Sequence, residues 1–114
     1  MVEVIRGDVV LCDLNPKFGT EQSGVRPVVI IQIDQANAVS LHTIIVPLTT
    51  KIREVILPSH LLIPAGEGGL NQVSVILAEQ IRVIDKTRII RVIGHLSDRY
   101  ITELAEVIKI ILGL

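Results

Sequence analysis

Short runs of apolar residues, most of them valine and isoleucine, recur along the greater part of the chain. They occupy residues 9–11, 28–33, 43–49, 61–63, 73–84 and 89–93. Side chains branched at Cβ fit a pleated surface, and runs of this length are typical of strands. Their spacing favours a small barrel over a parallel sheet with crossover helices.

Polar and turn-forming residues separate these runs. Residues 15–24 combine glycine, proline and polar side chains and are predicted to form a loop. Further turns are predicted at residues 34–42, 66–71 and 85–87. Pro27 precedes the second run, at a position where a strand can begin. Pro47 lies inside the third run and indicates an edge strand or a bulge, because proline has no N–H for a ladder bond.

The end of the chain has a helical period instead. Ser97 is a candidate N-cap, and Leu96 and Ile101 have the spacing of a hydrophobic staple. One apolar stripe recurs at helical spacing: Ile101, Leu104, Ile108 and Ile111. Other apolar residues lie off this stripe: Val107, Ile110 and Leu114. A helix that is apolar on two sides needs two surfaces to pack on, and we expect these to be the barrel and a second subunit.

Length and composition narrow the class of protein. The 114 residues suit a single domain over 1–114, and a hydrophobic content of 49% favours a homodimer that covers part of the apolar surface. A net charge of −1 argues against extended duplex DNA as a direct partner. The single cysteine, Cys12, excludes an intrachain disulfide, and no signal peptide or membrane-spanning stretch is visible. A cytoplasmic location is therefore expected.

The residues give little support for a metal or a cofactor. His42, His60 and His95 are isolated in the sequence, without the spacing of metal ligands, so no metal site is predicted. The glycines of residues 66–69 lack the strand-to-helix context of a dinucleotide site. Ser59 beside His60 suggests a nucleophile and a base, but adjacent strand residues point to opposite faces. We therefore expect a loop serine beside a structural histidine.

Several motifs in a fixed order carry a more specific signal. The first motif is Arg6-Gly7-Asp8, which precedes the first predicted strand, and the segment from Asp13 to Pro16 follows that strand. A loop then reads Gly-Thr-Glu-Gln-Ser-Gly-Val-Arg-Pro over residues 19–27. Pro47-Leu48-Thr49 ends the third run, and residues 74–82 read Ser-Val-Ile-Leu-Ala-Glu-Gln-Ile-Arg. In these motifs, over nearly its whole length, the chain resembles the MazF/PemK family of toxins.

The resemblance implies a mainly β fold with α: an SH3-like, partly open β-barrel with a C-terminal helix, found as a homodimer. It also implies the toxin of a type II toxin–antitoxin system, inhibited by a cognate antitoxin protein and meeting DNA only through that antitoxin. The implied activity is sequence-selective cleavage of single-stranded RNA, usually mRNA. The ribose 2′-OH attacks the phosphate without a metal ion or other cofactor and leaves 2′,3′-cyclic phosphate and 5′-OH ends.

Site residues follow from the same resemblance. The family's central catalytic pair matches Arg26 and Thr49, and the chemistry suits both, since a guanidinium binds phosphate oxygens and a hydroxyl donates to them. Arginine resists deprotonation, which makes Arg26 a poor base. Glu21 in the same loop is the candidate base, although the identity of the general acid and base stays open.

The surrounding residues are expected to bind RNA. Gln22 would orient a phosphate or a base edge, and Lys17, Lys51 and Arg53 would steer the backbone. Phe18 would either stack on a base or pack on its own barrel. Two other residues are expected to be structural: Glu79, through a pair with Arg82 or Arg91, and Cys12, in the core.

Two other functions remain possible for such a barrel. One is a non-enzymatic toxin similar to the CcdB gyrase poisons. The loop with Glu21 and Arg26, together with Thr49, argues against it. The other is an SH3-like interaction module. These modules usually line their groove with aromatic residues, and this chain has only Phe18 and Tyr100.

Overall fold

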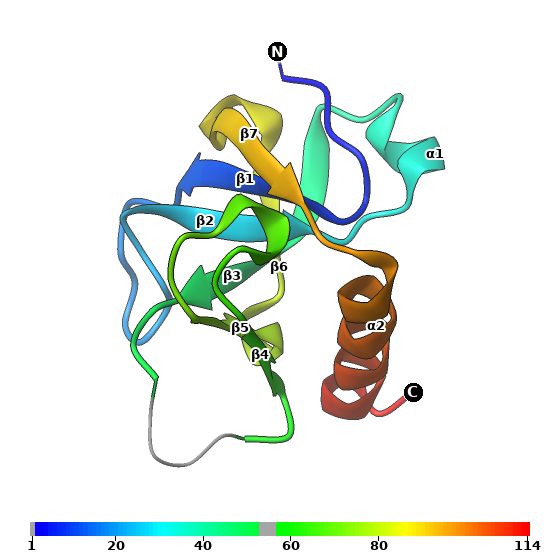
Figure 1. Ribbon diagram of the computed structural model, residues 1–114. Helices are drawn as coiled ribbons and strands as arrows, with labels where there is room; N and C mark the ends of the chain where they lie inside the picture. Colours follow the sequence, from blue (N-terminus) through cyan, green and yellow to red (C-terminus); the bar gives the residue numbers. More distant parts are fainter. Residues whose placement is uncertain (1, 53–56) are drawn as a thin grey trace.

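The computed structural model describes residues 2–52 and 57–114, and antiparallel strands make up most of its regular secondary structure (Figure 1). The strands are β1 (Asp8–Asp13), β2 (Val25–Ile30), β3 (His42–Thr49), β4 (His60–Ile63), β5 (Ser74–Leu77), β6 (Arg82–Asp85) and β7 (Ile89–His95). The α-helices are α1 (Asp34–Asn37) and α2 (Asp98–Leu112). Three short 3₁₀ helices join strands in the described chain: η1 (Glu67–Gly69), η2 (Ala78–Gln80) and η3 (Lys86–Arg88).

The sheet has the order β4-β5-β3-β2-β1-β7, and β6 pairs separately with β3. Strand β3 therefore has two partners on one edge: residues 42–45 pair with β6, whereas Leu48 and Thr49 pair with β5. The sheet curls around β1–β3 without β6 and β7 pairing. This arrangement confirms the predicted mainly β class, with a partly open barrel followed by a C-terminal helix.

Strand β3 is central in the sheet, so the prediction of an edge strand at Pro47 was wrong. Pro47 lies opposite Val28 of β2. On the other edge it falls between Ile45, which pairs with β6, and Leu48, which pairs with β5. In an antiparallel strand, the N–H groups of successive residues point alternately to the two sides, and the nitrogen of Pro47 points to the side between the β6 and β5 pairings. The strand tolerates proline there because no neighbouring strand needs its N–H.

Other boundaries also differ from the prediction, and the apolar run over 73–84 divides into β5, η2 and β6. Strand β2 begins at Val25 and ends at Ile30, because residues 25–27 pair with Asp13, Cys12 and Leu11 of β1. Pairing with a neighbouring strand thus overrides the polar character of Arg26. The turn predicted over 34–42 contains the short helix α1, and it ends one residue early because His42 begins β3.

Apolar clusters cover both faces of the central strands. Adjacent residues Val9 and Val10 are both fully buried, although their side chains point to opposite faces of β1. Val10 belongs to a cluster inside the barrel with Cys12, whereas Val9 belongs to a second cluster that includes Leu104 of α2. Burial on both faces explains why the sequence shows continuous apolar runs rather than strict alternation.

Helix α2 follows β7 and packs beside β4 and η2 (Figure 1). Ser97 occupies the predicted N-cap position, but its hydroxyl does not cap the helix. Its Oγ donates to Glu67 Oε1 over 3.0 Å, and its backbone N–H donates to Glu67 Oε2 over 2.8 Å. Among the described residues, no helix is long and apolar enough to span a membrane.

The outer side of α2 supports the expectation of a homodimer. Leu104 is 3% exposed, whereas Ile110 is 61% exposed, and Leu114, which follows the end of the helix, is 85% exposed. We predict that sedimentation equilibrium at micromolar concentration will give twice the chain mass of 12.5 kDa, because a second subunit would remove this apolar surface from water. A mass equal to one chain under those conditions would contradict the prediction.

Candidate active site

A cavity of about 600 Å³ lies beside the loop of residues 14–24 and is also lined by the start of β2, the end of β3 and β5. A second cavity of about 340 Å³ adjoins it and shares part of its wall. The common wall consists of Thr20, Glu21, Gln22, Glu79 and Gln80. Only the larger cavity also contains Lys17, Arg26, Thr49, Lys51 and His60.

A break in the sheet brings Arg26 and Thr49 to the same place. Strands β2 and β3 pair from Ile30↔Ile45 to Val28↔Pro47. The next ladder bond would need the N–H of Pro27, which proline lacks, so pairing stops there. Continued past this point, the same register places Arg26 opposite Thr49. Both residues line the larger cavity, at the place where the strands separate.

The guanidinium of Arg26 is held by its own loop. Its Nε donates to the Ser23 carbonyl over 2.8 Å, and its Nη1 donates to Oε1 of Gln22. Its Nη2 donates to no residue in the described chain, so the N–H groups of this nitrogen remain available to a ligand in the cavity. The arginine is thus oriented on one side while keeping donors for an anion on the other.

Thr49 is the last residue of β3 and is half-buried. Its Oγ1 accepts a hydrogen bond from the backbone N–H of Lys51 over 3.2 Å. This bond fixes the oxygen and leaves the hydroxyl proton free for donation. Thr50 follows in a bend and is exposed.

The loop that carries the cavity's polar residues is anchored at its root. Arg88 of η3 donates through Nη1 to the carbonyl of Asp13, over 3.1 Å, and to that of Asn15. Asn15 Oδ1 accepts the N–H of Gly24 over 3.1 Å, and Leu14 donates its N–H to the Gly24 carbonyl over 3.0 Å. Gly24 has a φ of 80°, a left-handed conformation that favours glycine. The loop therefore leaves and rejoins the sheet at a fixed position.

Gln22 and Gln80 form the partition between the two cavities. The backbone N–H of Gln22 donates to Gln80 Oε1 over 2.7 Å, and Gln22 Oε1 accepts from Arg26. The sequence suggested that Gln22 would orient a phosphate or a base edge. In the structure its amide oxygen contacts Arg26, so it also positions the guanidinium.

The structure corrects two expectations about Ser59, His60 and Glu79. Ser59 lies in a turn before β4, so the argument that strand neighbours point apart does not apply to it. Its Oγ donates to Glu79 Oε2 over 2.8 Å, and His60 Nε2 lies 3.0 Å from the same oxygen. Glu79 therefore contacts Ser59 and His60 rather than the expected Arg82 or Arg91. No local signal in the sequence linked Glu79 to Ser59 or His60.

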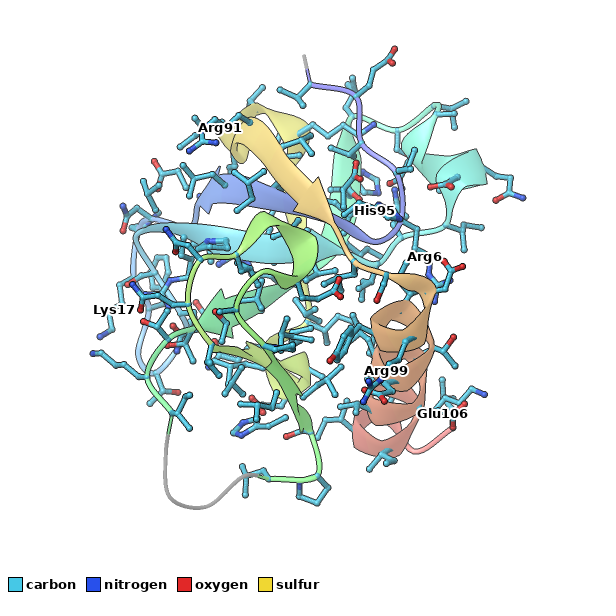
Figure 2. All side chains as sticks on the ribbon, in the orientation of Figure 1. Arg6, Lys17, Arg91, His95, Arg99 and Glu106 are labelled. Atoms are coloured by element: carbon cyan, nitrogen blue, oxygen red, sulfur yellow. The ribbon has the colours of Figure 1, made fainter. Side chains whose placement is uncertain are left out.

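The expected RNA-binding residues are distributed around the cavity. Lys17 and Lys51 line it, and Figure 2 shows the Lys17 side chain extending outward from the loop. Glu21 is exposed and lines both cavities. Phe18 is 67% exposed and lines neither cavity, so it does not pack on its own barrel. Arg53 lies outside the described residues.

Two other kinds of chemistry, a metal site and a cysteine nucleophile, can be compared with the described residues. Within residues 2–52 and 57–114, no three histidine, cysteine, aspartate or glutamate side chains lie close enough to hold a metal ion. Cys12 is fully buried in the barrel, as predicted, and burial raises the pKa of its thiol to about 11. The polar chemistry of the cavity comes from arginine, lysine, threonine, histidine and carboxylate side chains.

Comparison with known proteins identifies the family. Residues 5–112 match the PemK-like, MazF-like toxins of type II toxin–antitoxin systems. The chain belongs to this family. It is 45% identical over 111 residues to endoribonuclease EndoA of Bacillus subtilis (strain 168), a match that covers 97% of this chain and 96% of the relative. It is also 45% identical over 109 residues to endoribonuclease MazF of Staphylococcus saprophyticus, covering 96% and 91%.

Solved structures of family members share the fold. MazF from Deinococcus radiodurans superposes with a TM-score of 0.86 at 23% identity and covers 100% of both chains. A mycobacterial endoribonuclease in complex with its cognate antitoxin gives a TM-score of 0.82 at 22% identity, covering 97% of this chain and 96% of the other. The barrel and the C-terminal helix are thus those of the MazF/PemK family.

Proposed function

We propose that this protein is the toxin of a type II toxin–antitoxin system and a metal-independent endoribonuclease acting on single-stranded RNA. The observation that carries the proposal is that Arg26 and Thr49 line one cavity, at the place where β2 and β3 separate. Two family members 45% identical to this chain are named endoribonucleases. The expected setting is the cytoplasm, where mRNA is the accessible substrate.

The cavity supplies the groups that cleavage by a ribose 2′-OH requires. The nucleophile and the phosphorus belong to one molecule, so bringing them together costs little entropy. The 2′ oxygen forms a bond to phosphorus, the bond from phosphorus to the 5′ oxygen breaks, and a cyclic phosphate and a 5′-OH result. Free N–H groups of Arg26 and the Thr49 hydroxyl would stabilise the charge that develops on the phosphoryl oxygens. Glu21 is the candidate acceptor for the 2′ proton.

The surroundings of the cavity fit a single RNA strand. Lys17 and Lys51 add positive charge at the rim of the larger cavity, which attracts a phosphate backbone. Phe18 is exposed beside it and can stack on an unpaired base. The whole chain has a net charge of −1, so the attraction of a phosphate backbone is confined to this cavity. Such a local attraction suits a short single strand better than a long duplex.

The first test is RNA cleavage by the purified protein in excess EDTA. The proposal predicts discrete cut sites on a long RNA that persist when the chelator is present, and primer extension would map them. Intact RNA under conditions in which the protein is folded would instead favour a non-enzymatic toxin similar to the CcdB gyrase poisons. The family to which the chain belongs does not favour that alternative.

An antitoxin is expected to inhibit cleavage by covering the cavity. An acidic segment lying along it would pair with Lys17, Arg26 and Lys51 and exclude RNA. We therefore predict that affinity for the antitoxin falls as salt concentration rises, because salt screens exposed charges. Titration calorimetry at several ionic strengths would measure this dependence. A tightly bound antitoxin that left RNA cleavage intact would show that the site lies elsewhere.

A further inference from the structure

The guanidinium of Arg26 takes its orientation from the loop of residues 14–24 rather than from the sheet. The backbone of Arg26 belongs to β2. Within the described chain, however, its side chain bonds only to loop residues, through Nε to the Ser23 carbonyl and through Nη1 to Gln22. The hydroxyl of Thr49 is held instead by the backbone N–H two residues further along. The direction in which Arg26 presents its free N–H groups therefore depends on how firmly the loop is fixed.

One peptide group connects Arg26 to the root of the loop. The peptide bond between Ser23 and Gly24 is trans, so its C=O and N–H lie in one plane and point in opposite directions. The carbonyl accepts a hydrogen bond from Arg26 Nε over 2.8 Å, and the N–H donates to Asn15 Oδ1 over 3.1 Å. Donation by the N–H also polarises the carbonyl and strengthens it as an acceptor. Asn15 thus holds, through one rigid group, the oxygen that orients the guanidinium.

The backbone of Asn15 is itself fixed on both sides. Its N–H donates to Asp13 Oδ1 over 2.9 Å, and its carbonyl accepts a hydrogen bond from Nη1 of Arg88. Arg88 belongs to η3, and η3 is tied to the body of the protein by Lys86, a buried residue whose Nζ donates to the carbonyl of Asn37. Asn15 is therefore a supported residue from which a side-chain bond can position the far end of the loop.

The side chain of Asn15 has no other visible task in this part of the molecule. It is exposed and lines neither of the two cavities, so it is not placed to bind a phosphate there. Within residues 2–52 and 57–114 it bonds only to Gly24. Replacing an exposed side chain leaves no buried cavity and should preserve the fold. Any effect on the reaction can then be assigned to the lost hydrogen bond.

We propose that Asn15 is a positioning residue for RNA cleavage that acts through Arg26, an inference that rests on the proposed function. Its amide oxygen fixes the peptide group between Ser23 and Gly24, and that group directs the guanidinium toward the phosphoryl oxygens. Without this bond the peptide plane can turn, and the guanidinium spends less time in the productive direction. The loss falls on the rate of the bound complex, because a small misplacement of a transition-state contact slows the chemical step.

The first experiment measures single-turnover cleavage of a defined RNA at saturating protein. Asn15→Ala should cleave about tenfold more slowly, since one oriented hydrogen bond is lost. Asn15→Asp keeps an oxygen acceptor at the same place and should stay within about threefold of the unmodified protein. Asn71→Ala removes another exposed asparagine outside both cavities and should cleave normally.

Double variants show whether Asn15 acts through Arg26. In an Arg26→Ala protein, adding Asn15→Ala should change the rate by less than about twofold, because no guanidinium remains to be positioned. In a Thr49→Ala protein, the same addition should still cost about tenfold. A side chain that merely stabilised the loop would lower the rate by equal factors in both proteins. That result, or a normal rate for Asn15→Ala alone, would overturn the proposal.

A second experiment does not depend on activity. In protein labelled with ¹⁵N, the Nε–H signal of Arg26 is identified by its absence from the spectrum of Arg26→Ala. Asn15→Ala should speed the exchange of this proton with water, whereas Asn15→Asp should preserve its protection. Unchanged exchange in Asn15→Ala would overturn the proposal. If exchange changed as expected but the unmodified protein cleaved no RNA, the proposed function would be wrong, whereas the control of Arg26 by Asn15 would stand.

Discussion

Single-turnover cleavage of one defined RNA is expected to slow about 10²–10³-fold when either Arg26 or Thr49 is replaced by alanine. Each change removes a donor that we propose is directed at the phosphoryl oxygens, where negative charge develops in the transition state. The loss of one such donor costs roughly 3–4 kcal/mol of transition-state stabilisation. Both side chains are only half-buried, so truncation leaves no closed cavity and should preserve the fold by circular dichroism.

Matched variants make this result specific. Thr50→Ala alters an exposed neighbour outside the cavity wall and should cleave RNA normally. Thr49→Ser keeps the hydroxyl and should retain most of the activity. Arg26→Lys keeps the charge but loses the forked donors, so it should fall between the unmodified protein and Arg26→Ala. If Arg26→Ala kept more than about a tenth of the normal rate, the active site would not be at this loop.

The second large effect lies in the substrate. An RNA with a single 2′-deoxyribose on the 5′ side of the cut should not be cleaved at that position, because it lacks the nucleophile. The loss should be complete, since the cavity holds no group proposed to attack phosphorus in its place. Electrophoresis of the otherwise identical RNA, end-labelled, would measure it.

A matched deoxyribose placed one nucleotide further along the strand serves as the control for altered binding. That substrate keeps the attacking hydroxyl and should be cut at nearly the normal rate. Cleavage at the original position of the first substrate would instead mean that water or a protein side chain attacks phosphorus. It would contradict the mechanism while leaving the location of the site intact.

Much of the fold could be predicted from the apolar runs, because each strand contains a short run of aliphatic residues. The boundaries that were missed depend on contacts between distant segments. Val25, Arg26 and Pro27 join β2 because β1 pairs with them, and no local preference reveals this partner. Pro47 lies within a central strand because two different strands share one edge of β3, which only the assembled sheet defines.

The candidate site also contains residues that the sequence predicted and a contact that it did not. Arg26, Thr49 and Glu21 were proposed from ordered motifs, and the structure brings all three to one cavity. The contact of His60 with Glu79 was not predicted, because the two residues are 19 positions apart and no local signal links them. That η2 packs beside the start of β4 cannot be inferred from the spacing of residues along the chain.

The anchoring of the loop has a consequence for the order in which the protein becomes active during synthesis. Arg26 is made early, but Gln80 and Arg88, which hold its loop, follow much later in the chain. Strand β1, at the root of that loop, also lacks its β7 neighbour until residues 89–95 have left the ribosome. A nascent chain therefore cannot assemble the cavity until residues 80–95 have been made and can fold against the loop and β1.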